Sequence, residues 1–296
     1  MNDQTTNHKA GFVNIVGRPN VGKSTLMNAL VGEALSTTNP KAQTTRHRIL
    51  GILNGDDYQL VFSDTPGIID PAYAMQESMM RVINDALEDA DILLLMVEPQ
   101  QRNPFGDAFI QRLKAIDIPV LLLINKIDTS NQKELENVHV FWKSLLHNVE
   151  FWNISALHTF QLDALKQRLV ELLPQSPPYY PKDVLTDRSE RFFCEEIVRE
   201  KILSLYDKEI PYAVQAIVEE FKEEDELIRI RMTIYVERES QKNIIIGKGG
   251  SGIKRVSMLA RKDMEAFFNK KIFLEPFVKV AKNWRKDEIK LKRFGY

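Results

Sequence analysis

The strongest constraint on this chain is an eight-residue segment at 17–24 that fits the phosphate-loop pattern G-x-x-x-x-G-K-[ST]. Its residues are Gly17, Arg18, Pro19, Asn20, Val21, Gly22, Lys23 and Ser24. The apolar run 12–16 before it suits a buried strand, and residues 26–30 after it suit the first turns of a helix. Such a loop points backbone N–H groups and a helix N-terminus at phosphate oxygens, so it predicts a nucleotide site. A chance match in a plain loop is the alternative.

Composition is typical of a soluble globular protein, with 44% hydrophobic and 27% charged residues over 296 positions. The net charge is −1, yet residues 241–296 hold 15 Lys and Arg against 5 Asp and Glu, a local balance of +10. This asymmetry indicates a polyanionic partner for the C-terminal part. The single cysteine, Cys194, excludes an internal disulfide and a Cys-rich metal site. The longest apolar runs are about a third of a membrane span, so no transmembrane helix is expected.

Continuous apolar runs alternate with helical patterns between residues 11 and 173. This alternation predicts an α/β fold, a mostly parallel six-stranded sheet with helices on both faces. Strands are expected at 12–16, 49–53, 59–63, 92–97, 120–124 and 149–154, and helices around 75–87, 105–115, 132–146 and 162–172. The turn at 54–57, Asn-Gly-Asp-Asp, predicts a hairpin between two of these strands and hence one antiparallel edge strand.

The pattern changes after residue 173. Four prolines within residues 174–181 predict an extended, semi-rigid connector. We therefore expect a first domain at 1–173, a linker at 174–182 and a second domain at 183–296. The second domain has helical patterns at 192–206 and 253–268 and strand patterns at 214–218, 228–236 and 272–280. With a further helical segment before residue 247, the order α-β-β-α-α-β predicts a small α+β domain.

Further motifs follow the phosphate loop at the ends of predicted strands. Asp64, Thr65, Pro66 and Gly67 come after the strand at 59–63. The Asp64 carboxylate can hold Mg²⁺ through water, and the Gly67 N–H can meet a γ-phosphate, as in loops that a nucleotide orders.

A second group of motif residues indicates which base is bound. Asn125, Lys126 and Asp128 follow the strand at 120–124, and Ser155 and Ala156 follow the next strand. The Asp128 carboxylate can accept both hydrogen bonds from the N1–H and 2-amino edge of guanine, an edge that adenine lacks. Lys126 would lie along the base, Asn125 would tie this loop to the phosphate loop, and Ser155 and Ala156 would back the base.

In this order and spacing the motifs resemble those of the translation-factor-related GTPases, and most closely the bacterial Era-type GTPases, over essentially the full chain. The similarity rests on G-R-P-N-V-G-K-S at 17–24, Q-T-T-R-H at 43–47, D-T-P-G at 64–67, N-K-I-D at 125–128 and S-A-L at 155–157. The resemblance implies a GTPase that binds GTP and GDP with Mg²⁺, and it adds Thr25 to the nucleotide-binding residues. It also implies catalytic roles for Lys23, Thr45, Gly67 and Asn20.

Two positions bear on how hydrolysis is promoted. Ile68 follows Gly67, and an isoleucine cannot orient the attacking water as a glutamine does. Related GTPases with an apolar residue here use a K⁺ ion held partly by an asparagine at the position of Asn20, so the resemblance implies a K⁺ site; the alternative is that Asn20 only shapes the loop. The resemblance also implies a threonine that completes a Mg²⁺ site with Ser24 and Asp64, and alignment through Arg46 favours Thr45 over Thr44.

The second domain carries a glycine loop inside the pattern I-I-G-x-x-G-x-x-I, which resembles a type II KH domain. A glycine loop lets the backbone approach a nucleic-acid strand closely, and KH loops clamp about four nucleotides of single-stranded RNA. The basic tail, with aromatic residues among its cations, suits phosphate contact and base stacking; a merely solvated tail is the alternative. The expected RNA-contacting residues are Ile246, Gly247, Lys248, Gly249, Gly250, Ile253, Lys254, Arg255, Lys282, Trp284 and Arg285.

Together these features predict a GTP-hydrolysing switch that controls RNA binding by a KH domain. The family resemblance adds the target: the 3′ end of 16S rRNA during assembly of the 30S ribosomal subunit. It also implies a cytoplasmic monomer without a DNA partner, with peripheral attachment to the inner membrane left open. Two other interpretations compete: a passive RNA-binding scaffold with a degenerate GTPase fold, and a GTPase that acts in tRNA modification or at membranes.

Overall fold

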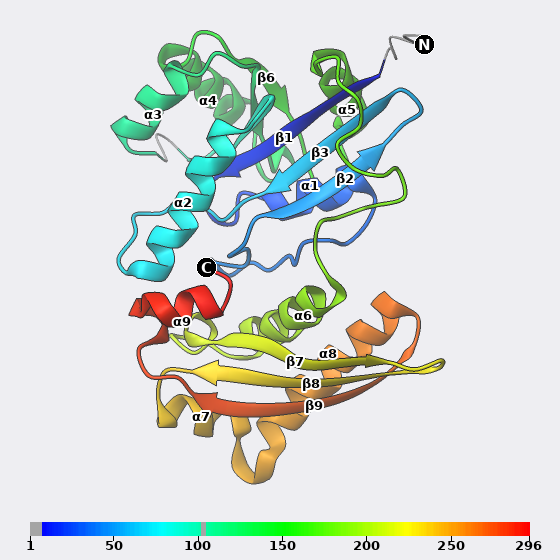
Figure 1. Ribbon diagram of the computed structural model, residues 1–296. Coiled ribbons are helices and arrows are strands. Elements are labelled where there is room, and N and C mark those ends of the chain that lie inside the picture. The colour runs from blue at the N-terminus through cyan, green and yellow to red at the C-terminus, as the bar shows by residue number, and fades with distance from the viewer. Residues whose placement is uncertain (1–7, 102–104) are drawn as a thin grey trace. The chain divides into compact units, whose positions relative to one another are not determined.

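The apolar runs of the first half form the central strands of one sheet in the computed structural model, which describes residues 8–101 and 105–296 (Figure 1). The strands are β1 Lys9–Gly17, β2 Ile49–Asn54, β3 Tyr58–Asp64, β4 Ile92–Val97, β5 Val120–Ile124 and β6 Glu150–Asn153. Their spatial order is β2-β3-β1-β4-β5-β6, and all pairs are parallel except β2 with β3. The predicted mostly parallel six-stranded sheet and its hairpin are confirmed.

Helices cover both faces of this sheet, as predicted (Figure 1). They are α1 Lys23–Val31, α2 Ala74–Glu88, α3 Asp107–Lys114, α4 Gln132–Leu145 and α5 Leu162–Leu172. Ile83 of α2, Ile110 of α3 and Trp142 of α4 are buried in one core with β4 and β5. On the other face α1 and α5 contact each other and β3. Strands β4 and β5 are buried along their whole length because helices lie on both sides of them.

The second half has the predicted order α-β-β-α-α-β. Its elements are α6 Glu190–Leu205, β7 Gln215–Glu223, β8 Leu227–Val236, α7 Glu239–Ile246, α8 Ser251–Phe268 and β9 Lys271–Val280, followed by a short helix α9 Glu288–Arg293. Strand β8 pairs antiparallel with β7 and parallel with β9. Alternate residues of β8, such as Ile230 and Met232, are buried with Val198 of α6 and Met264 of α8. Helices therefore cover one face of this three-stranded sheet.

The chain divides into two compact units, each made of several separate segments of the sequence. The first unit includes residues 45–70 and 79–187, and the second includes 37–44, 71–78 and 188–296. Two segments that border the Mg²⁺ and γ-phosphate motifs thus belong to the unit of the KH-like sheet. Among the described residues, no helix combines the length and apolarity needed to cross a membrane.

The proline-rich segment is packed against the first unit, which extends through it to Asp187. The buried Gln59 of β3 accepts hydrogen bonds from the backbone N–H groups of Tyr179 and Tyr180 at 2.7 and 3.0 Å. The N–H of Ile52 donates to the Leu185 carbonyl at 2.8 Å, so the segment also satisfies the edge strand β2. Composition predicted an extended connector, but not that one glutamine and a sheet edge would hold it.

Candidate nucleotide and RNA sites

The phosphate loop joins the carboxyl end of β1 to the first residue of α1. Lys23 is buried there, and its Nζ donates to the backbone carbonyls of Gly17 at 3.3 Å and Arg18 at 3.0 Å. Burial lowers the pKa of Lys23 to about 8, and the nearby Asp64 carboxylate opposes part of this effect. Carbonyl groups compensate a buried ammonium less well than phosphate oxygens do, so this lysine is poised to gain from binding a polyanion.

The phosphate loop and the base-binding loop are joined by Asn125. Its Nδ2 donates to the Val21 carbonyl at 2.7 Å, and its Oδ1 accepts from the Ala156 N–H at 2.9 Å. Gly22 lies beside it with φ +101°, and a Cβ there would fall 2.3 Å from Asn125 Nδ2. Glycine is required at 22 for both its backbone conformation and this close approach. One amide thus fixes the three loops relative to one another.

Three side-chain oxygens converge at the start of α1. The Ser24 hydroxyl donates to Asp64 Oδ2 at 2.6 Å, the Thr45 hydroxyl donates to the same oxygen at 3.1 Å, and the two hydroxyls are 3.0 Å apart. Asp64 Oδ1 is buried and has no hydrogen-bond partner among the described residues. Burial raises the pKa of Asp64, opposed by Lys23 and the neighbouring hydroxyls. Hard oxygen donors and an unsatisfied carboxylate oxygen fit Mg²⁺.

The two adjacent threonines have different partners. Thr44 Oγ1 donates to the Lys41 carbonyl at 2.7 Å, whereas Thr45 is buried and bonds Asp64. The geometry therefore places the hydroxyl of Thr45, and not that of Thr44, with the side-chain oxygens of Ser24 and Asp64. Arg48, in the basic group that follows, is bound to Asp89 and to Ser63 within the first unit.

The segment after β3 brings its backbone against the phosphate loop. A Cβ on Gly67 would lie 2.5 Å from the Pro19 nitrogen, so only glycine permits this approach. The Thr65 hydroxyl donates to the Ile15 carbonyl at 2.7 Å, and the Ile68 N–H donates to the Gly17 carbonyl at 3.0 Å. The Ile68 side chain is buried in the core of the first unit.

The base-binding loop presents a carboxylate at the carboxyl end of β5. Asp128 Oδ1 accepts from the Ser155 hydroxyl at 2.6 Å, and 28% of the Asp128 side chain is exposed, so it remains accessible to a ligand. Lys126, with φ +61°, donates to the Asn20 carbonyl at 2.7 Å and forms an ion pair with Glu98. Asn20 also has a left-handed backbone, with φ +66°, which turns its carbonyl to this lysine.

The glycine loop of the second unit separates α7 from α8. Gly249 and Gly250 have φ of +59° and +80°, and a Cβ at either would meet nothing within 4 Å, so the backbone here is open to a ligand. A Cβ on Gly247 would instead lie 2.7 Å from the Gly252 nitrogen. Exposed cations flank the loop, namely Lys248, Lys254 and Arg255. An open backbone beside positive charge suits a nucleic-acid strand.

Comparisons with known proteins give the same two parts. Residues 12–126 match the family described as 50S ribosome-binding GTPase, and residues 209–285 match the KH domain. The chain is 44% identical to GTPase Era of Thermoanaerobacter sp. (strain X514) over 98% of its length and 97% of the relative. It is 46% identical to GTPase Era of Syntrophus aciditrophicus (strain SB) over 97% of its length and 95% of the relative. The chain belongs to the Era family of GTPases.

Solved Era structures match nearly the whole chain. One is Era in complex with MgGDPNP and nucleotides 1506–1542 of 16S ribosomal RNA; it is 36% identical, has a TM-score of 0.92, and the match covers 98% of this chain and 99% of that one. Another is an Aquifex aeolicus Era variant bound to GDP.AlF4-, with the same identity and TM-score over 97% of this chain and 99% of that one. The fold of this Era-family member, GTPase domain followed by KH domain, is thereby confirmed.

The prediction that the C-terminal tail contributes Trp284 to the RNA site is wrong. Trp284 is fully buried, donates its indole N–H to the Ala213 carbonyl at 3.0 Å and packs edge-on against Phe294. Its ring is therefore part of the core and is not exposed for base stacking. Arg285 forms an ion pair with Glu237 and its guanidinium lies 4.9 Å from the centre of the Tyr73 ring. Of the three expected tail residues, Lys282 is the exposed one.

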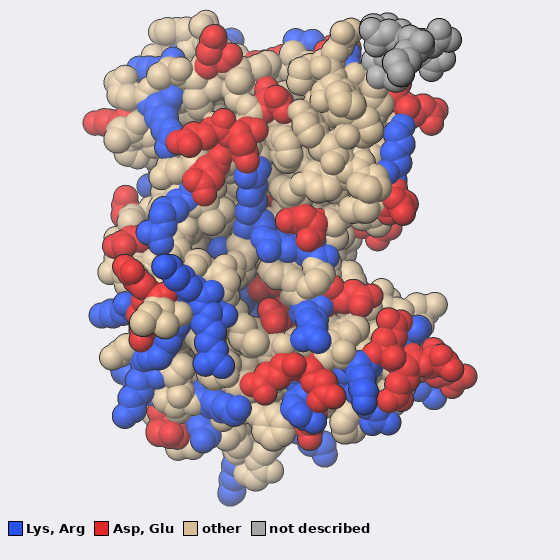
Figure 2. Space-filling view, in the orientation of Figure 1, with Lys and Arg blue, Asp and Glu red and all other residues tan. Residues whose placement is uncertain are grey.

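The open face of the β7-β8-β9 sheet carries mixed charge. Figure 2 shows acidic and basic side chains interspersed over these strands. Arg231 bridges Glu220 at 3.1 Å and Glu275 at 3.0 Å, and Lys279 lies 3.7 Å from Glu219. Because these cations are paired with carboxylates, this face should attract a polyanion less strongly than the exposed cations beside the glycine loop do.

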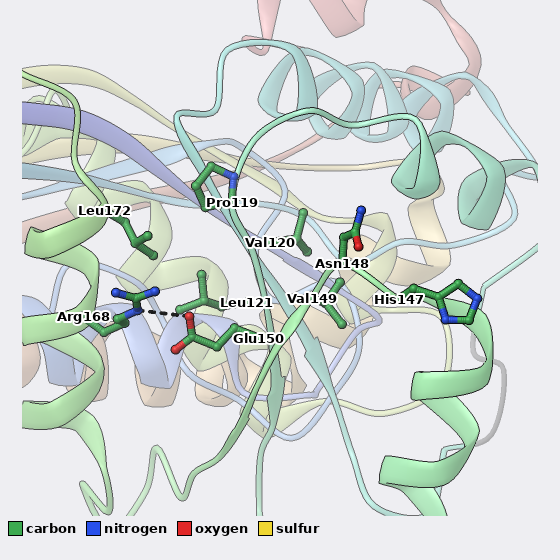
Figure 3. A pocket seen from close by; sticks show the side chains of 9 residues that line it. All are labelled: Pro119, Val120, Leu121, His147, Asn148, Val149, Glu150, Arg168 and Leu172. Carbon is green, nitrogen blue, oxygen red and sulfur yellow. Dashed lines mark hydrogen bonds and ion pairs between the residues drawn. The ribbon is translucent and has the colours of Figure 1, made fainter.

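A cavity of about 440 Å³ lies at the edge of the first sheet opposite the nucleotide motifs (Figure 3). Pro119 and His147 precede β5 and β6 there, and Arg168 of α5 closes one side. Arg168 is bound to Glu150 at 3.0 Å and to Glu171 at 2.8 Å, so its charge is already compensated. Ligands of open α/β sheets bind outside the carboxyl ends of the strands, which is the other edge.

The sequence analysis did not predict some residues that lie at the two candidate sites. Glu98 pairs with Lys126, and its position directly after β4, at the carboxyl edge of the sheet, was the available signal. Ile244 and Met258 are 50% and 56% exposed on the helices that flank the glycine loop. Their exposure breaks the helical pattern of buried apolar residues, which indicates a surface suited to unstacked bases.

Proposed function

We propose that this Era-family protein is a GTP-hydrolysing switch that binds the 3′ end of 16S rRNA through its KH domain during assembly of the 30S subunit. One observation carries the proposal: side chains suited to guanine and Mg²⁺ and an open, cation-flanked glycine loop occur in the same chain. The relative whose structure holds MgGDPNP and nucleotides 1506–1542 of 16S rRNA supports this choice of RNA.

The residues divide the work of hydrolysis among binding, orientation and charge neutralisation. Asp128 accepts the N1–H and 2-amino group of guanine, while Ser155 holds the carboxylate and Asn125 holds the loops. Lys23 and the loop N–H groups hold the β- and γ-phosphates. Ser24, Thr45 and Asp64 would hold Mg²⁺, which neutralises charge on the phosphates when bound. The Asp64 carboxylate would contact the Mg²⁺ through a water molecule, as the sequence predicts.

The γ-phosphate is the part of GTP that this arrangement can sense. We propose that it orders the segments around Thr45 and Gly67, and that this ordering changes how the KH domain engages RNA. Both segments adjoin residues that belong to the second compact unit, 37–44 and 71–78. Hydrolysis removes the γ-phosphate and hence the interactions that held the two segments.

The decisive experiment crosslinks RNA to the protein in the presence of a non-hydrolysable GTP analogue and sequences the attached fragments. Reads concentrated at the 3′ end of 16S rRNA are expected. Reads spread over unrelated RNA would reject the proposed target, and reads from tRNA would favour the tRNA-modification alternative. A Lys23→Ala variant distinguishes the scaffold alternative: if it loses GTP binding but still supports 30S assembly, the protein acts as a passive scaffold.

We further propose that K⁺ assists catalysis at Asn20, since Ile68 is buried and supplies no polar group. Hydrolysis is expected to be faster in KCl than in NaCl at equal ionic strength, because K⁺ would add positive charge beside the β–γ bridge. Asn20→Ala should remove the difference while the Mg²⁺ requirement persists. Equal wild-type rates in the two salts would leave Asn20 as a residue that only shapes the loop.

The proposal places the protein in the cytoplasm as a monomer with RNA, and not DNA, as its nucleic-acid partner. Peripheral attachment to the inner membrane is tested by sedimentation with lipid vesicles at physiological salt. Sedimentation that depends on anionic lipid would support attachment through the basic C-terminal region, and its absence would restrict the protein to the cytosol.

A further inference from the structure

A buried arginine of α6 holds the segment that leads into Thr45. Only 2% of the Arg199 side chain is exposed. Its Nε donates to Glu196 Oε1 at 2.8 Å, and its two terminal nitrogens donate to the backbone carbonyls of Gln43, at 3.2 Å, and Thr44. Segment 37–44 and α6 belong to the same compact unit. The arginine therefore fixes the two peptide groups immediately before Thr45.

The held segment has a conformation that it would not adopt readily by itself. Gln43 has φ +60°, a left-handed backbone conformation that is unfavourable for a residue with a Cβ. Strain of this kind persists where surrounding contacts determine the backbone, and the Arg199 hydrogen bond to the Gln43 carbonyl is one such contact. Thr45, two residues after Gln43, donates its hydroxyl to the Asp64 carboxylate.

Other residues near the end of α6 bind the same segment. Asn39 Nδ2 donates to the Ser204 hydroxyl at 2.7 Å, and Lys41 Nζ donates to the Tyr206 carbonyl at 2.7 Å. The first of these contacts is exposed and the second is partly buried, whereas the Arg199–Glu196 pair is buried and bidentate. A planar guanidinium can bond a carboxylate and two carbonyls at once, which a lysine cannot do. Arg199 is thus the principal anchor of the segment.

We propose that Arg199, oriented by Glu196, is a positioning residue for Thr45, presenting its hydroxyl to the Mg²⁺ of the GTP-bound state. The inference rests on the proposed function, in which Thr45 holds Mg²⁺ while the γ-phosphate is present. Arg199 acts through the backbone carbonyls at 43 and 44. Helix α6, which carries Arg199, also contributes Val198 and Ile202 to the core of the second unit.

The test uses a variant that removes both buried charges, Arg199→Met with Glu196→Gln, since removal of the arginine alone strands a buried carboxylate. Affinity for a GTP analogue is expected to fall about tenfold, whereas GDP affinity changes less than about twofold. The Mg²⁺ concentration for half-maximal GTP hydrolysis should rise about tenfold as well, because Thr45 is no longer held in place.

Arg199→Lys is the second variant, because it keeps the charge beside Glu196 but cannot reach both carbonyls. It should shift the Mg²⁺ requirement in the same direction by a smaller factor, and it decides the question if the double variant does not fold. Arg231→Ala is the matched control, an arginine of the same unit that also bridges two carboxylates, and it should leave the Mg²⁺ requirement unchanged.

An unchanged Mg²⁺ requirement and an unchanged preference for the GTP analogue over GDP, in a variant with lowered thermal stability, would make Arg199 a purely structural residue. This outcome is separate from failure of the proposed function. Wild-type protein that neither hydrolyses GTP nor binds the RNA would reject the function itself, whereas active wild type with insensitive Arg199 variants would reject only the positioning role.

Discussion

In the proposed function Asp128 carries the nucleotide specificity of the site, because guanine offers two hydrogen-bond donors to its carboxylate. In Asp128→Asn the amide oxygen can still accept from N1–H, but the amide nitrogen faces the 2-amino group, donor against donor. GTP affinity should fall by at least about a hundredfold, since one charge-assisted hydrogen bond becomes a neutral one and the other becomes a donor–donor repulsion. Xanthosine triphosphate carries a carbonyl at that position and should bind the variant better than GTP does. Competition against a fluorescent nucleotide measures both affinities.

Ser155→Ala is the control for this substitution. It removes the 2.6 Å hydrogen bond to Asp128 Oδ1 but leaves the carboxylate in place. The variant should weaken GTP binding without creating any preference for the xanthine nucleotide. If Asp128→Asn and Ser155→Ala behaved alike, the carboxylate would only be supporting the loop.

The buried Lys23 makes nucleotide binding depend on pH. Its pKa is about 8 in the free protein, and phosphate oxygens raise it in the complex. Affinity is therefore expected to be full at pH 7 and below and to fall as the pH rises through 8, because binding must then take up a proton. Between pH 7 and 8.5 the affinity should fall about fourfold, with about three quarters of a proton taken up at pH 8.5.

Calorimetry in two buffers of different ionisation enthalpy measures this proton uptake. The heat of GTP binding at pH 8.5 should depend on the buffer, while at pH 6.5, where the free lysine is already charged, the contribution of Lys23 should vanish. Identical heats in both buffers at pH 8.5 would show that Lys23 is charged before the nucleotide arrives.

At the residue scale the sequence identified the chemistry, but the choice of Thr45 over Thr44 came from the family resemblance and not from residue type. Two threonines stand side by side, and the direction of the backbone decides which hydroxyl reaches Asp64. The contact of Arg199 with residues 43 and 44 could not be predicted either, because Arg199 is about 155 residues away in the sequence and no motif marks it. Its role depends on which segment the fold places against it.

Helix α6 and strand β7 are linked by a carboxyl group whose protonation affects stability. Glu195 accepts a hydrogen bond from the Val218 N–H at 2.7 Å. Burial, and then the charge of Glu196, raise the pKa of Glu195 to about 7, against the effect of the Val218 bond. The folded pKa lies above the unfolded one, so the stability that this group contributes is full below about pH 4.5 and is lost as the pH rises to 7.

Glu195→Gln should therefore stabilise the second domain at pH 8 relative to wild type, by on the order of 2 kcal/mol, with little effect at pH 4.5. The amide keeps an acceptor for Val218 and never becomes charged. Urea unfolding at the two pH values gives the difference directly. Glu219→Gln is the control: hydrogen bonding to Thr233 lowers the pKa of Glu219, so that variant should gain no stability at pH 8.

Secondary structure was predictable wherever burial and periodicity agree. Strands β4 and β5 are continuous apolar runs because both faces are covered, and β8 alternates because one face is open. The prediction was wrong for Trp284 of the C-terminal tail. Lysines and arginines surround Trp284 in the sequence, so the sequence predicted an exposed RNA-binding segment. Its ring instead packs with Phe294 and Tyr296 against the KH core, a long-range contact that composition does not reveal.

At the scale of the whole molecule, the proposed switch requires that nucleotide and RNA change each other's binding affinity by the same factor. If the GTP analogue raises RNA affinity by some factor relative to GDP, RNA must raise the preference for the GTP analogue over GDP by the same factor. A factor of about five or more is expected for a coupling that a ribosome-assembly switch can use. Anisotropy of a labelled 16S 3′-end fragment gives the first factor, and nucleotide titrations with and without that RNA give the second.

Two substitutions then separate affinity from coupling. Lys248→Ala removes an exposed cation of the glycine loop and should weaken RNA binding equally in both nucleotide states, lowering the salt slope by about 0.7 for one lost phosphate contact. Thr45→Val keeps the shape of a side chain bound to Asp64 but removes its hydroxyl, so RNA affinity with GDP should persist while the factor falls toward one. If Thr45→Val retained the full factor, the γ-phosphate would have to signal through Gly67 alone, and the contacts between α6 and segment 37–44 would not be part of the switch.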